Sequence, residues 1–80
     1  MPTVHELITA SDRQIERMRL RVQRQKVHVE HLEREHYEAE ARRARIILNR
    51  TLGELSFLQR YRLSLYQQAA FADVTKKEVS

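Results

Sequence analysis

The stretch ITASDRQIERMRLRVQRQKVHVEHL at positions 8–32 decides the fold of this chain. Two positions of its seven-residue repeat are mostly apolar: position a holds Ile8, Ile15, Val22 and Val29, and position d holds Ser11, Met18, Gln25 and Leu32. Such a repeat is typical of a helix that packs along one narrow stripe, here called the seam, against another helix. No Gly or Pro interrupts it.

Beyond residue 40 the repeat resumes in a shifted phase. Position a now holds Ala41, Leu48, Leu55, Arg62 and Ala69, and position d holds Ala44, Thr51, Leu58, Leu65 and Ala72. Further apolar side chains flank this second seam at Ile47, Leu52, Tyr61 and Tyr66. This apolar stripe is wider than a two-stranded coiled coil needs, which favours a bundle of more than two helices.

The phase shift between residues 35 and 41 has two interpretations. It can mark a turn between two helices, which the near-equal halves favour, or a discontinuity inside one continuous helix. The absence of a helix breaker from Glu33 to Arg45 favours the continuous helix. Both forms bring the same residues into contact, because an antiparallel dimer of straight helices is the domain-swapped form of the hairpin.

Charge blocks favour an antiparallel arrangement. Residues 30–40 carry five glutamates, and residues 42–50 carry four arginines. Antiparallel packing about residue 38 lays the acidic block beside the basic one, whereas a parallel dimer opposes like charges. The pairs brought together are Glu30, Glu33 and Glu35 with Arg42, Arg43 and Arg45.

The sequence therefore predicts an all-α fold of two long antiparallel helices forming a hairpin; the alternative is one continuous helix in an antiparallel coiled-coil dimer. The first helix is expected over 9–36, capped by Ser11 with Gln14 or by Thr9 with Asp12. A turn near 37–38 leads into a second helix over 39–71. We expect residues 1–8 to be a loose lead-in and residues 72–80 to be a frayed tail.

Two helices alone cannot cover so wide an apolar stripe, which predicts a homodimer that forms a four-helix bundle. The predicted oligomer interface consists of seam residues and one neighbour: Ile15, Met18, Val22, Val29, Leu32, Leu48, Leu52, Leu55, Leu58 and Leu65.

Several short segments resemble a family of short uncharacterised bacterial proteins that is common in rhizobia and their relatives. They are Arg21-Val22, Arg24-Gln25, Leu32-Glu33-Arg34, Ile47-Leu48 and Thr51-Leu52. The resemblance covers about residues 12–60 and implies a helical hairpin, with no assigned activity. The relatives carry an Asp-Gly-His-Asp-Thr-like turn, where this chain has Glu35-His36-Tyr37-Glu38 without the glycine.

The residue inventory argues against catalysis and cofactors. The chain has no Cys and a single Gly, which excludes a thiol nucleophile and a glycine-rich phosphate loop. Glu33 and His36 have the spacing of a ferritin-like metal motif, but a di-iron site needs two copies. We therefore expect no enzyme, no cofactor and no metal site. With no apolar run of 18 residues and no signal peptide, we expect no membrane association and a cytoplasmic location.

The outward face of the first helix is the candidate functional surface. It carries Arg13, Arg17, Leu20, Arg24 and Val27. An apolar pair on a polar face indicates contact with a protein partner, so the leading hypothesis is a small oligomeric helical adaptor or regulatory protein. The alternative is a basic helical protein that binds nucleic acid, with the arginines contacting phosphates. Phe57 and Leu63 lie off the second seam and are further candidates for a docking face.

Overall fold

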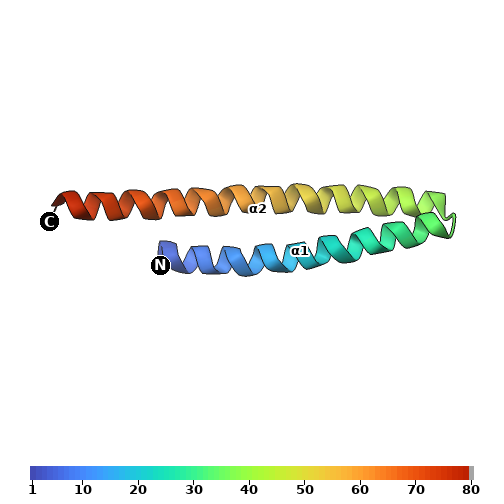
Figure 1. Ribbon diagram of the computed structural model, residues 1–80, viewed down its shortest axis with the longest axis horizontal. Coiled ribbons are helices and arrows are strands. Elements are labelled where there is room, and N and C mark those ends of the chain that lie inside the picture. Colours follow the sequence, from blue (N-terminus) through green and yellow to red (C-terminus); the bar gives the residue numbers. More distant parts are fainter. Residues whose placement is uncertain (80) are drawn as a thin grey trace.

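The computed structural model of this protein is a hairpin of two helices (Figure 1). Helix α1 spans Val4–Arg34, with 31 residues, and α2 spans Glu38–Val79, with 42 residues. The hairpin measures 66 × 19 × 15 Å. The structure describes the backbone of residues 1–79 and the side chains of residues 1–71. The predicted all-α hairpin is confirmed, and the chain does not form the alternative continuous helix.

Helix α1 begins earlier than predicted. Thr3 is the N-cap, and its Oγ1 accepts a hydrogen bond from the Glu6 N–H at 3.1 Å. Thr3 and Glu6 have the Thr-x-x-Glu spacing of a capping box, which favours a helix start at this point. The predicted lead-in over residues 1–8 is therefore wrong from Val4 onward. Ser11, one of the expected caps, is instead buried in the seam.

The end of α1 is a Schellman motif. The Tyr37 N–H donates to the Leu32 carbonyl at 2.9 Å, and the His36 N–H donates to the Glu33 carbonyl at 3.2 Å. His36 has a φ of 62°, the left-handed conformation that this motif requires at its first residue beyond the cap. The turn occupies residues 35–37, so both helix boundaries lie slightly before the predicted positions. A histidine thus stands where such turns usually have a glycine.

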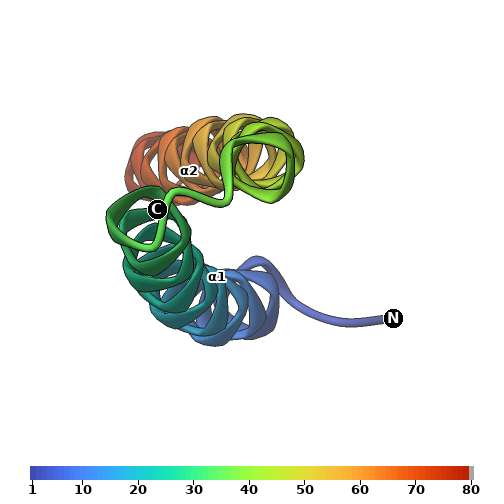
Figure 2. The same ribbon diagram turned by 90° about the vertical axis from the view of Figure 1, so that its right-hand side faces the viewer.

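Both seams face inward along the hairpin. The apolar residues buried there are Ile8, Ile15, Val22, Val29, Ala41 and Leu65. Two polar residues, Ser11 and Thr51, are buried with them. The other described a and d side chains from Met18 to Ala69 are half-buried. Ala72 lies outside the described side chains. In Figure 2 the two helices are inclined to each other, as expected when seven-residue seams wrap around one another.

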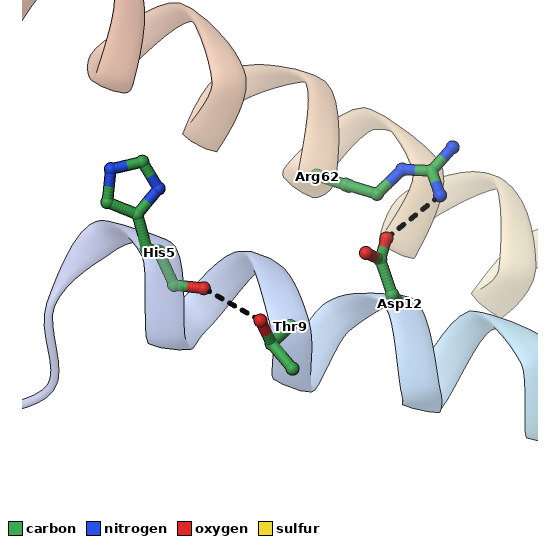
Figure 3. A network of polar contacts seen from close by, with 4 residues as sticks. All are labelled: His5, Thr9, Asp12 and Arg62. Carbon is green, nitrogen blue, oxygen red and sulfur yellow. Dashed lines mark hydrogen bonds and ion pairs between the residues drawn. The ribbon is translucent and has the colours of Figure 1, made fainter.

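Two ion pairs connect the helices in the described part of the chain. Arg45 Nη1 lies 2.8 Å from Glu33 Oε1, and Arg62 Nη1 lies 3.1 Å from Asp12 Oδ1 (Figure 3). The first pair joins the acidic block to the basic block, as the antiparallel prediction requires. Both are partly exposed, so each contributes about 0.2–1 kcal/mol to the free energy of unfolding. Their main effect is to fix the register of the two helices.

Helix α2 is longer than predicted. It continues past residue 71 to Val79, so most of the predicted tail is helical, and Ser80 lies outside the described residues. Its final turns extend beyond the start of α1 (Figure 1).

Candidate protein-interaction surfaces

The outward face of α1 carries all five residues predicted for a partner or phosphate surface. Leu20 is 48% exposed and Val27 is 61% exposed. They stand seven residues apart, two turns of helix, so both point to the same side. The three arginines between and beside them, Arg13, Arg17 and Arg24, are also exposed. Arg24 is held along the helix, since its Nε donates to the Leu20 carbonyl at 3.4 Å.

Most residues predicted for the oligomer interface pack against the other helix of the same chain. Ile15, Val22, Val29 and Leu65 are buried in the hairpin. The remaining seam members of that set are half-buried: Met18, Leu32, Leu48, Leu55 and Leu58. Leu52 lies on the flank and is exposed. The half-buried residues keep part of their apolar surface at the edges of the seam, where a further helix could reach it.

One edge of the seam carries apolar and small residues interspersed with the charged Arg50 and Glu54, and we name this surface the Phe57 flank. It comprises Ile47, Gly53, Phe57 and Tyr61 of α2 together with the adjoining edge of Met18 in α1. Phe57 is 63% exposed. The spacing of four residues from Gly53 to Phe57 and from Phe57 to Tyr61 places the three on successive turns of one side.

Two open hollows lie along the Phe57 flank. The one nearer the turn has a volume of about 350 Å³ and is lined by Gln25, His28 and Leu32 opposite Ala44 and Ile47, among others. The middle one has a volume of about 520 Å³ and is lined by Gln14 and Met18 of α1 and by Arg50, Gly53, Glu54, Phe57 and Leu58 of α2. Neither hollow is enclosed, which is a shape suited to the side chains of another helix rather than to a small ligand.

The opposite edge carries a second apolar group, the Leu63 flank, formed by Leu52, Leu63 and Tyr66. Leu63 is 57% exposed. Phe57 and Leu63, both predicted off the seam, are thus on different flanks and cannot belong to one contact patch. Their separation follows from the 600° of helical rotation over six residues, which leaves them about 120° apart.

Gln25 is a seam residue whose side-chain oxygen lacks a hydrogen-bond donor in the part of the chain that the structure describes. Its Oε1 is buried and accepts no hydrogen bond among the described residues. The two fully buried polar residues of the seam differ from Gln25: Ser11 lies near the start of α1, and Thr51 Oγ1 donates to the Ile47 carbonyl at 3.1 Å. An unpaired buried amide oxygen lowers the stability of the fold.

The Phe57 flank as a unit is not among the predicted surfaces. The repeat predicts Ile47 and Tyr61 as neighbours of the seam and Phe57 as a separate candidate, and it gives Gly53 no role. The signal was present in the spacing of Gly53, Phe57 and Tyr61, which repeats every four residues on α2.

The metal-like spacing of Glu33 and His36 does not form a cluster of ligands among the described side chains. No group of three or more His, Asp or Glu side chains among residues 1–71 could hold a metal ion. Glu33, part of the metal-like spacing, is instead paired with Arg45. No helix in the described residues combines the length and apolar character needed to cross a bilayer.

Comparisons with protein-family models, with curated proteins and with solved structures find no match to this chain. The resemblance to the short rhizobial proteins therefore stays a prediction, and the surfaces described above are interpreted from their own geometry.

Proposed function

We propose that this protein is a small, non-catalytic, homo-oligomeric helical adaptor or regulatory protein of the bacterial cytoplasm that acts by binding another protein through a helix face. The observation that carries the proposal is the exposed apolar pair on the outward face of α1, Leu20 and Val27. This face points away from α2, so the hairpin makes no use of it. Apolar side chains in a charged surrounding favour a protein contact with a buried centre and a polar rim.

The test separates the apolar pair from the arginines. Tagged protein is used to capture partners from a lysate of the source cells, followed by mass spectrometry. Leu20→Ser with Val27→Ser should weaken capture of a specific partner at least about tenfold, because it removes the apolar centre of the contact. Arg17→Gln with Arg24→Gln should have a smaller effect, because charges at a rim contribute mainly to association rate.

Each variant must keep the parent's circular dichroism spectrum, which is expected because surface substitutions change stability little. If the arginine pair matters more and the captured material is DNA or RNA whose binding falls steeply with salt, the nucleic-acid alternative replaces the proposal. If the serine pair captures every partner of the parent at equal strength, this face is not the functional one.

A further inference from the structure

We infer that the Phe57 flank is a homodimer interface, on which a second copy of this chain packs antiparallel with a two-fold axis passing beside Phe57. This inference rests on the oligomeric part of the proposed function and assigns it a surface and a direction. The surface is separate from the outward face of α1, which the dimer leaves open to another partner.

The first support is the area that the hairpin leaves exposed. The chain has 6705 Å² of accessible surface. A compact monomer of 9.6 kDa has about 5,100 Å², so the hairpin exposes roughly 1,600 Å² more than a compact fold of its mass. An excess of this size leaves room for a standard dimer interface, which covers about 800 Å² on each copy.

The second support is the single glycine of the chain. Gly53 lies within α2, has no positive φ, and a Cβ built there meets nothing within 4 Å. Neither backbone conformation nor crowding inside the hairpin requires a glycine, and glycine is the poorest helix former after proline. A residue without a side chain does, however, allow another chain to approach closely. Gly53 lines the middle hollow next to Phe57, the place where the second copy would dock.

The third support is the arrangement of residues around Phe57. Arg50 and Ser64 stand one seven-residue repeat before and after it, on the same side of α2. A two-fold axis at Phe57 places Arg50 opposite Ser64 of the second copy, whereas a parallel dimer would set Arg50 against its own counterpart. The same axis brings Tyr61 level with Gly53 and Glu54 of the second copy. The tyrosine ring then covers the space at the glycine, and its hydroxyl can donate to the Glu54 carboxylate.

Single cysteines test the location of the interface, because the chain contains none of its own. Phe57→Cys is treated with a short bifunctional maleimide, and Leu63→Cys is the matched control, since the two positions are similarly exposed on opposite flanks. We expect covalent dimer from Phe57→Cys at least about tenfold faster than from Leu63→Cys, because only the first thiol meets its counterpart at the two-fold axis.

A second pair tests the direction. Arg50→Cys and Ser64→Cys should each give little covalent dimer alone, and a mixture of the two should give the mixed dimer. Covalent dimer from Arg50→Cys alone would mean a parallel arrangement and would overturn the inference.

Gly53→Leu provides a measurement without crosslinking. The dimer dissociation constant from sedimentation should rise about tenfold or more, because the added side chain occupies the space assigned to Tyr61 of the second copy. Ser56→Leu, an exposed position on the Leu63 flank, is the matched control and should leave dimerisation unchanged. Both variants should remain helical, since leucine is the better helix former at each position.

The outcomes also distinguish the inference from the proposed function. Rapid crosslinking through Leu63→Cys, or an unchanged dissociation constant for Gly53→Leu, would show that the Phe57 flank is not the interface. Either result would still be compatible with an oligomeric adaptor. A parent protein that light scattering finds at 9.6 kDa throughout the micromolar range overturns both the inference and the oligomeric part of the proposed function.

Discussion

His36 determines where this chain reverses direction. It adopts the left-handed backbone conformation in a Schellman turn, where a β-carbon is disfavoured by contact with neighbouring backbone atoms. The turn nevertheless forms, because the hydrogen bonds from His36 and Tyr37 satisfy two carbonyls at the end of α1 and the two seams close behind it. The hydrogen bonds of the turn and the packing behind it therefore offset the unfavourable backbone conformation of one residue.

The first prediction is that His36→Gly stabilises the hairpin. Glycine removes the steric penalty of the left-handed conformation but adds freedom to the unfolded chain, so the net gain should be about 0.5–1 kcal/mol in the free energy of unfolding. Urea denaturation followed by circular dichroism measures it. His36→Ala is the control, because it removes the imidazole and keeps the β-carbon, and it should bring no such gain. A destabilised glycine variant would mean that the imidazole itself makes a needed contact.

At the scale of the element, exposure changes sharply between neighbouring residues of α2. Leu65 is 2% exposed in the seam, while Leu63 is 57% exposed on the flank. We predict that Leu65→Ala lowers the free energy of unfolding by about 2–4 kcal/mol, because it leaves a cavity between the helices. Leu63→Ala should change it by less than about 0.5 kcal/mol. Equal effects in a urea titration would show that the seam of α2 faces a different direction.

The seam also carries the polar defect at Gln25. Replacing it with Leu removes a buried acceptor that has no donor, so Gln25→Leu should raise the free energy of unfolding by about 1–2 kcal/mol. Thr51→Val, at a polar seam residue whose hydroxyl is already hydrogen-bonded along its own helix, should stay within about 1 kcal/mol of the parent. A polar seam residue can also fix the register, so the Gln25→Leu variant should show additional oligomeric species in sedimentation. A less stable Gln25→Leu variant would indicate that the amide has a donor in solution.

Seams were the part of the fold that the sequence predicted well. Both a and d series turn inward, because a seven-residue repeat of apolar side chains is stable only when it is covered. Helix ends were predicted less well. Thr3 and Glu6 have the same capping spacing as Ser11 and Gln14, and several competing caps near one another cannot be ranked without the packing that follows. The flanks were predicted in part: Phe57 and Leu63 are off the seam as expected, but the grouping of Phe57 with Gly53 and Tyr61 on one flank was not predicted.

At the scale of the whole molecule, the hairpin and a domain-swapped dimer are nearly equal in the contacts they make. Both pair Glu33 with Arg45 and Asp12 with Arg62, either within one chain or between two. The two forms differ only at residues 35–37. In the hairpin these residues form the Schellman turn, and in the swapped dimer they would be part of a continuous helix. The shape of the molecule is therefore controlled by a three-residue turn rather than by the packing of its helices, which is the same in both forms.

The last prediction is that this turn can be converted to helix. Replacing Glu35, His36 and Tyr37 with alanine removes none of the seam and supplies the strongest helix former at all three positions. The continuous helix would then be favoured, and two chains would exchange halves in an antiparallel dimer that preserves every seam contact. Small-angle scattering should show a maximum dimension of roughly 130 Å, because about 43 residues of each chain extend in opposite directions from the crossing point at 1.5 Å per residue. The parent should stay below about 90 Å. His36→Gly should keep the short dimension, because glycine reinforces the turn. If the alanine variant also stays short, the side chains of residues 35–37 do not determine the hairpin.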